Sequence, residues 1–142
     1  MPERHTRRAL VDTSVILDLE RVDPGTLPEE LAISAVTLAE LAAGPHATDD
    51  PAERARRQDQ LQRVEGTFDV LPLDAAVART FGRVYAAVAA SGRKARGRRA
   101  LDMMIAATGL ASDLPIYTRN ADDFRVLAAL VDVRPVVLAV DA

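Results

Sequence analysis

The chain of 142 residues contains no cysteine and no tryptophan, and its only histidines are His5 and His46. The absence of cysteine excludes a disulfide framework and thiolate chemistry. Together with two scattered histidines, it also argues against a zinc site. No segment approaches the roughly 20 apolar residues of a membrane span. The apolar run after the first arginines is interrupted by Asp12 and Asp18, so it does not fit a signal peptide. We therefore expect a cytoplasmic protein.

Lysine is almost absent as well, because Lys94 is the only one among 18 basic residues. Five of these 18 lie in the segment 93–99 (R-K-A-R-G-R-R), while the remaining 13 are outnumbered by 21 acidic residues. Arginines grouped in this way bind the phosphate backbone of nucleic acids without reading its sequence. A solvated loop and a contact with an acidic partner are the alternatives. The candidate substrate-binding residues are Arg93, Arg96, Arg98 and Arg99.

The composition, with 49% hydrophobic and 27% charged residues, is typical of a globular domain. The length predicts one domain over residues 1–142. Short apolar segments alternate with segments of helical periodicity, which predicts an α/β fold with a mainly parallel sheet and helices on both faces. We expect strands at 8–12, 31–34, 68–71 and 114–118, with a fifth within 131–138. We expect a helix capped by Thr13 or Ser14 that runs to about Arg21, one at 35–43 capped by Ser34, and one capped by Asp74 that runs to about residue 90. Further helices are expected at 52–65 and at about 100–111, with weak helicity at 121–130.

Polar and acidic side chains follow several of these strands. Asp12 ends the first strand, Glu40 lies six residues after the second strand, and Asn120 and Asp123 follow the strand that ends at Thr118. Asp102 is the only acid on an otherwise apolar helix. Ligand sites in parallel sheets lie outside the carboxyl ends of the strands. We therefore expect these side chains to lie together at that edge of the sheet, which is called the acidic rim below.

Crowded carboxylates repel one another, and a hard divalent cation removes that repulsion. Mg²⁺ and Mn²⁺ take oxygen ligands, and such ions support attack of water on a phosphodiester. The pattern predicts that Asp12 and Asp102 hold the metal. Structural explanations stay open for each residue. Asp12 would cap a helix, Asp102 would complement the helix dipole in the first turn, and Glu40 and Asp123 would be solvated.

Four segments in this order are similar to the PIN-domain family, specifically to the VapC-type toxin ribonucleases. They are L10-V11-D12-T13-S14-V15, S34-A35-V36-T37-L38-A39-E40-L41, L101-D102-M103-M104-I105-A106-A107-T108 and Y117-T118-R119-N120-A121-D122-D123-F124. The resemblance implies a three-layer α/β/α sandwich with about five strands. It also implies an Mg²⁺- or Mn²⁺-dependent endoribonuclease, the toxin of a type II toxin–antitoxin system that inhibits translation or growth. A homodimer and a VapB-type antitoxin are implied as partners.

By position in these segments, Asp12, Glu40 and Asp102 match three acids of the family's site. The fourth acid is replaced by Asn120, and Asp123 is the alternative carboxylate for that position. Thr13, Ser14 and Thr118 are predicted to hydrogen-bond the carboxylates or their waters.

Two rival interpretations remain open at this stage. A response-regulator receiver or an aspartate-nucleophile phosphatase would also place an acid after the first strand. Both use a lysine from a late strand, however, whereas Lys94 lies in the basic segment, and Ser14 stands where the phosphatases have a second aspartate. The other rival is a non-catalytic module that binds RNA or protein.

Overall fold

The computed structural model describes residues 7–93 and 97–139, so Lys94 and Arg96 of the basic segment lie outside the described residues. The described chain contains one five-stranded sheet in which all paired strands are parallel, in the order β3-β2-β1-β4-β5. This confirms the predicted α/β architecture. The strands are β1 (Arg8–Val11), β2 (Glu30–Ser34), β3 (Asp69–Leu71), β4 (Ile116–Thr118) and β5 (Val133–Pro135).

Within residues 7–93 and 97–139, the strands are connected by five α-helices and four short 3₁₀ segments. The helices are α1 (Thr13–Leu17), α2 (Ala35–Ala43), α3 (Pro51–Thr67), α4 (Ala75–Ala90) and α5 (Arg98–Ala111). The 3₁₀ segments are η1 (Leu19–Arg21), η2 (Pro24–Thr26), η3 (Gly44–Ala47) and η4 (Ala121–Leu127). In the described part of the chain, no helix is both long and apolar enough to span a bilayer.

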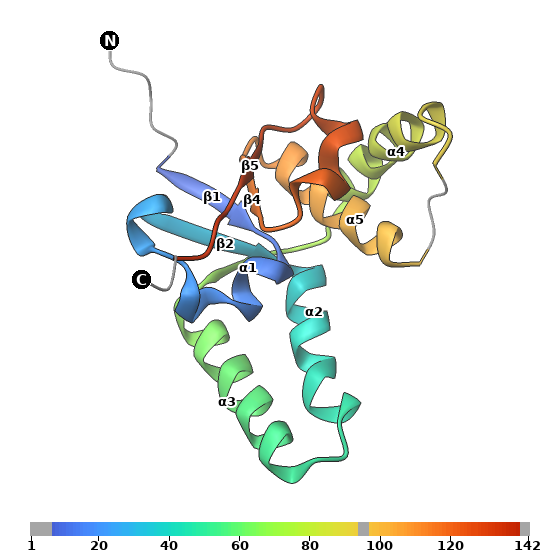
Figure 1. The fold of residues 1–142 in the computed structure, drawn as a ribbon. Helices are drawn as coiled ribbons and strands as arrows, with labels where there is room; N and C mark the ends of the chain where they lie inside the picture. The colour runs from blue at the N-terminus through green and yellow to red at the C-terminus, as the bar shows by residue number, and fades with distance from the viewer. Residues whose placement is uncertain (1–6, 94–96, 140–142) are drawn as a thin grey trace.

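The sheet separates two apolar clusters, as expected when successive strand residues point to opposite faces. Leu10 and Ala32 face α4, α5 and η4, while Val11 and Ile33 face α1 and α3. Figure 1 shows these two helical layers, with α4 and α5 on one side and α1 and α3 on the other. The predicted three-layer α/β/α sandwich is therefore confirmed.

The central position of β1 brings distant segments together. β1 pairs with β2 and with β4, and the register places Val11 beside Tyr117. The residues that follow these three strands therefore meet at one edge of the sheet. They are Asp12 after β1, the start of α2 after β2, and the segment after Thr118. Pro135 lies in β5 at the sheet edge, where a residue without an N–H donor is tolerated.

Several helix starts agree with the predicted ones. Ser34 and Asp74 cap α2 and α4, accepting hydrogen bonds from the main-chain N–H of Thr37 and Val77. Both caps are short-range signals, in which a side-chain oxygen satisfies a free N–H of the first turn.

Two predicted helix starts are wrong. The cap of α1 is Asp12 itself, not Thr13 or Ser14, and α1 ends at Leu17, after which the chain continues as η1. Helix α5 begins at Arg98, two residues earlier than expected, after Gly97 with a φ of 66°. Asp102 therefore lies beyond the first turn, where the dipole explanation for its position no longer holds.

Candidate active site

Asp12 is buried at the carboxyl end of β1, with only 4% of its surface exposed. Ser14 Oγ donates to its Oδ1 at 2.5 Å, and Thr118 Oγ1 donates to its Oδ2 at 2.6 Å. Its Oδ1 also accepts the main-chain N–H of Val15, which makes Asp12 the cap of α1. Asp12 is thus a helix cap and a member of the acidic rim at the same time.

Burial raises the pKa of Asp12 above its ordinary value, and the hydrogen bonds from Ser14, Thr118 and the main chain oppose this rise. The side-chain donors are neutral hydroxyl groups, so they stabilise the carboxylate without cancelling its charge. A cation at this edge of the sheet would gain from that remaining charge.

Glu40 reaches the same edge from the second turn of α2. Its Oε1 accepts a hydrogen bond of 2.7 Å from Thr13 Oγ1. Thr13 is also hydrogen-bonded to the buried hydroxyl of Thr37 at 3.0 Å. The main-chain N–H of Thr37 in turn donates to Ser34 Oγ, the cap of α2. This chain of buried hydroxyl groups fixes the side chain of Glu40 relative to β1 and β2.

Asp102 is the third acid, and it lies on α5 with 8% of its surface exposed. Arg98 Nε lies 3.8 Å from its Oδ1, which is close enough for an ion pair but too long for a hydrogen bond. Burial raises the pKa of Asp102 to about 6. This value already includes the charge of Arg98, which lowers the pKa, and the charges of Asp123, Asp12 and Glu40, which raise it.

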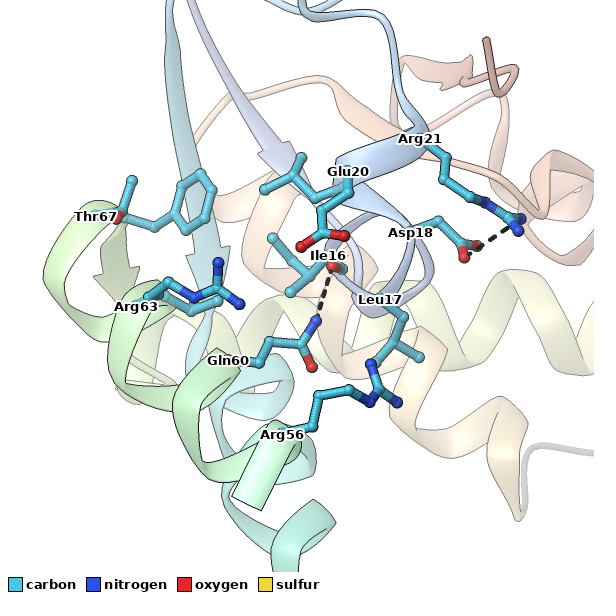
Figure 2. A pocket seen from close by; sticks show the side chains of 12 residues that line it. Ile16, Leu17, Asp18, Glu20, Arg21, Arg56, Gln60, Arg63 and Thr67 are labelled. Carbon is cyan, nitrogen blue, oxygen red and sulfur yellow. Dashed lines mark hydrogen bonds and ion pairs between the residues drawn. The ribbon is translucent and has the colours of Figure 1, made fainter. Parts of the chain in front are cut away.

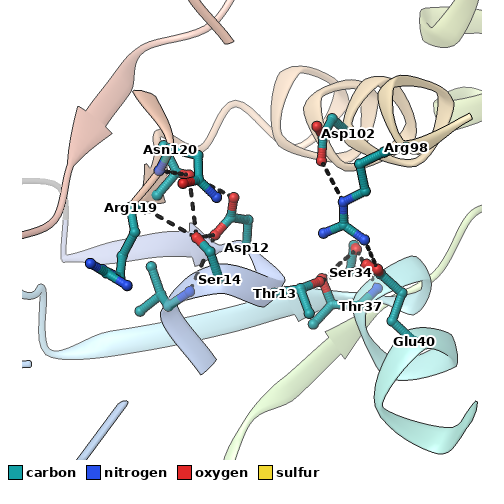
Figure 3. Close-up of polar contacts among 12 residues, drawn as sticks. Asp12, Thr13, Ser14, Ser34, Thr37, Glu40, Arg98, Asp102, Arg119 and Asn120 are labelled. Carbon is teal, nitrogen blue, oxygen red and sulfur yellow. Dashed lines mark hydrogen bonds and ion pairs between the residues drawn. The ribbon is translucent and has the colours of Figure 1, made fainter. Parts of the chain in front are cut away.

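The guanidinium of Arg98 lies between Glu40 and Asp102, as Figure 3 shows. Its Nη1 donates to Glu40 Oε2 and its Nε faces Asp102. Burial by itself lowers the pKa of Arg98, but the bond to Glu40 and the charges of Glu40, Asp102 and Asp12 outweigh it and raise the pKa. Three predicted site acids therefore act on one cation.

The two candidates for the fourth position occupy different places. The main-chain N–H of Asn120 donates to Thr118 Oγ1 at 2.9 Å, and its side chain is exposed. Asp123 is exposed in η4, and its charge acts on Asp102. Within the described residues, neither side chain forms a hydrogen bond with Asp12, Glu40 or Asp102, so the choice between them stays open.

The donor atoms of the acidic rim are of the type that divalent cations bind, although the side chains are not arranged around one common point. Within residues 7–93 and 97–139, no three acidic or histidine side chains stand close enough to hold one metal ion together. Arg98 lies where Glu40 and Asp102 would otherwise face each other. The donors at the rim are carboxylate and hydroxyl oxygens, the ligands that Mg²⁺ and Mn²⁺ prefer. Asp12 and Asp102 remain the candidate ligands.

The described arginines of the basic segment lie in different environments. Arg93 is exposed after α4, Arg99 is half-buried in the first turn of α5, and Arg98 enters the acidic site. Arg96 lies outside the described residues. The sequence placed Arg98 only among the phosphate-binding candidates and missed its bond to Glu40, 58 residues away.

Other contacts at the rim were also missed. The hydroxyl of Thr37 is hydrogen-bonded to that of Thr13. The only feature of the sequence that indicates a role for Thr37 is its position three residues after the helix cap Ser34. Arg119 forms an ion pair with Asp18, and its N–H donates to Ser14 Oγ at 3.1 Å. No sequence pattern indicates this pairing, since the two charged residues lie 101 positions apart.

One cavity borders the acidic site, and a second lies apart from it. One of about 390 Å³ is bordered by Glu40 and Arg98 and by Arg57 and Gln60 of α3. The other, of about 460 Å³, lies between the α1–η1 segment and α3, and Figure 2 shows it. None of Asp12, Glu40 and Asp102 lines this second cavity, so it is separate from the predicted site.

The chain is similar to known proteins over most of its length. The family model described as PIN domain matches residues 9–130. Ribonuclease VapC5 of Mycobacterium tuberculosis is 36% identical over 121 residues, which are 83% of this chain and 86% of that protein. Ribonuclease VapC4 of the same organism is 34% identical over 138 residues, 94% of this chain and 99% of that protein.

A solved structure agrees with these matches. It is described as a member of the VapBC family of toxin-antitoxin systems, VapBC-5, from Mycobacterium tuberculosis. It superposes with a TM-score of 0.79 at 35% identity, covering 91% of this chain and 98% of that one. The fold, the acidic rim and these matches show that the chain belongs to the PIN-domain family. Within the family it is of the VapC type, as the four sequence segments predicted.

Proposed function

We propose that this protein is an Mg²⁺- or Mn²⁺-dependent endoribonuclease, the toxin of a type II toxin–antitoxin system that inhibits translation or growth. The observation that carries the proposal is that Asp12, Glu40 and Asp102 come from three different elements to one edge of the sheet, where Arg98 pairs with Glu40 and Asp102 and Thr118 and Ser14 hold Asp12. Relatives of the VapC type bear the name ribonuclease. A site that gathers negative charge at a sheet edge is suited to divalent cations and phosphodiesters.

Asp12 and Asp102 would hold the divalent cation, and Glu40 with Asp123 or Asn120 would hold water around it or a second ion. The ion, when bound, polarises the scissile phosphate and lowers the pKa of water. Ser14 and Thr118 keep the Asp12 carboxylate in one orientation, and Thr13 does the same for Glu40. Glu40, whose Oε1 accepts a hydrogen bond of 2.7 Å from Thr13 Oγ1, would take the proton of the attacking water.

The arginines near the start of α5 would bind the RNA backbone. Arg93 is exposed after α4 and Arg99 lies in the first turn of α5, the helix that carries Asp102, and backbone contacts by arginine give affinity that depends on salt. We expect the double variant Arg93→Gln and Arg99→Gln to bind single-stranded RNA more weakly and with a flatter slope of log K against log salt. The slope should fall by about 0.7 for each phosphate that is no longer neutralised. Fluorescence anisotropy between low and moderate salt measures this slope. An unchanged slope would assign the segment to another partner.

A VapB-type antitoxin is the proposed protein partner, because solved structures similar to this chain are VapBC toxin–antitoxin complexes. A second copy of the chain is the other proposed partner. Leu73 and Tyr85, beside and on α4, leave 45% and 50% of their surface exposed, which suits a contact between helices. RNA and antitoxin would both be met in the cytoplasm.

The test of the function is a cleavage assay on total RNA with the purified full chain. We expect cleavage with Mg²⁺ or Mn²⁺ and none after addition of EDTA, with activity restored by excess metal. A matched reaction on DNA of the same length reports the preference for RNA. Binding of RNA without cutting under any metal condition would instead favour the non-catalytic module.

A further inference from the structure

Arg98 connects two acids that the chain brings together from distant positions. It is the first residue of α5, while Glu40 lies on α2, and the pair is separated by 58 positions in the sequence. Its Nη1 bonds Glu40 Oε2, and its Nε lies 3.8 Å from Asp102 Oδ1 (Figure 3). These are the oxygens that face into the acidic site from α2 and α5.

The same oxygens cannot serve Arg98 and a divalent cation equally well. A hard ion needs short contacts of about 2.0–2.1 Å for Mg²⁺ and a nearly octahedral set of oxygens. The guanidinium between Glu40 and Asp102 occupies the space that an ion would need beside Asp102 and that its bound water would need beside Glu40. In the described residues, no group of three potential ligand side chains is assembled around one point.

We propose that Arg98 is a tethered cation that neutralises the metal-free site and competes with the divalent ion for Asp102 and with the water around that ion for Glu40. The inference rests on the proposed metal-dependent function. Metal binding then requires the guanidinium to withdraw from both carboxylates. The affinity for metal is therefore set by this chain's own arginine as well as by its acids.

The geometry allows such a withdrawal. The Arg98 side chain is 57% exposed, whereas those of Glu40 and Asp102 are only 18% and 12% exposed. The arginine therefore has an open path to solvent, while the two acids stay in place. Thr13 holds Glu40 independently of Arg98, so the site does not lose that carboxylate when the arginine leaves.

Titration of the full chain with Mn²⁺ alone, without RNA, tests this competition. We expect Arg98→Gln to bind Mn²⁺ with a dissociation constant about tenfold lower than the wild type, because two ion pairs no longer have to break. Arg79→Gln is the matched control. It removes the same charge from the exposed side of α4, so its constant should stay at the wild-type value.

An Arg98→Gln constant that equals or exceeds the wild-type value overturns the competition while leaving the metal site intact. A wild type that binds no Mn²⁺ overturns the proposed metal dependence, and the inference with it. Calorimetry and the EPR signal of free Mn²⁺ both measure the constant, so the result does not depend on catalysis.

A second measurement follows the wild type itself and needs a variant only to assign one resonance. Addition of Mg²⁺ to the ¹⁵N-labelled wild type should shift the Arg98 Nε–H resonance, which is assigned by its loss in Arg98→Lys. Arg79 should keep its position in the same spectra. An Arg98 resonance that stays unchanged at saturating Mg²⁺ would show that the guanidinium never leaves the acids, and would refute the proposal.

Discussion

Replacing Asp12 with asparagine is expected to reduce RNA cleavage by at least about 100-fold. Substitutions of residues that only hydrogen-bond a metal ligand reduce activity by up to about 100-fold, and loss of a ligand itself should cost at least as much. The reason is electrostatic. The introduced amide would keep an oxygen that accepts the main-chain N–H of Val15, so the cap of α1 survives. The negative charge that a divalent cation requires would be gone. Initial rates of cleavage at saturating Mg²⁺ measure the loss.

The control is Asp74→Asn, the same substitution at another helix cap. Asp74 accepts the N–H of Val77 at 3.0 Å at the start of α4, in the same way as Asp12 does for α1. Both variants should unfold cooperatively with similar midpoints in urea, but only the Asp12 variant should lose activity. Wild-type cleavage rates in a folded Asp12→Asn protein would remove Asp12 from the site.

Asp102→Asn is expected to lose cleavage to a similar extent while making the metal-free protein more stable at neutral pH. Burial raises the pKa of Asp102 from 3.8 to about 6, so folding favours the protonated acid. Above this range the folded protein must hold a poorly solvated carboxylate. The amide avoids that cost, and the gain in free energy of unfolding should be about 1 kcal/mol once partial solvent access is included.

The raised pKa of Asp102 also determines how the stability difference between the two proteins changes with pH. Between pH 3.8 and about 6, the folded state binds more protons at Asp102 than the unfolded state does. Stability therefore falls as the pH rises through this range. The advantage of Asp102→Asn over the wild type should be small below about pH 4, grow up to about pH 6, and stay constant above it.

Urea unfolding of both proteins in EDTA at several pH values measures this difference. Other titrating groups act on both proteins alike and cancel in the comparison. An advantage that is constant over the whole range would mean that Asp102 titrates normally in the folded protein. Loss of cleavage without any pH-dependent difference in stability would mean that Asp102 is needed for cleavage but that burial does not raise its pKa.

Much of the fold was readable from local patterns. Ser34 and Asp74 were predicted as caps because a hydroxyl or carboxylate just before an apolar helical segment satisfies free N–H groups nearby in sequence. The parallel sheet followed from alternating strands and helices, and its strand ends located Asp12 and Glu40 at one edge. The start of α5 was misjudged, because residues of the basic segment resemble a loop in composition although Arg98 is already helical.

The sequence by itself determined the α/β class, the family and the acids that reach the rim, since each depends on residue types at short spacings. Only the tertiary structure decided that Arg98 lies between Glu40 and Asp102 and that Thr118 holds Asp12. The bonds from Arg98 to Glu40 and from Thr118 to Asp12 join residues 58 and 106 positions apart. A pattern of neighbours along the chain carries no information on such pairs, because the packing of β1 between β2 and β4 and of α5 against the sheet sets their distances.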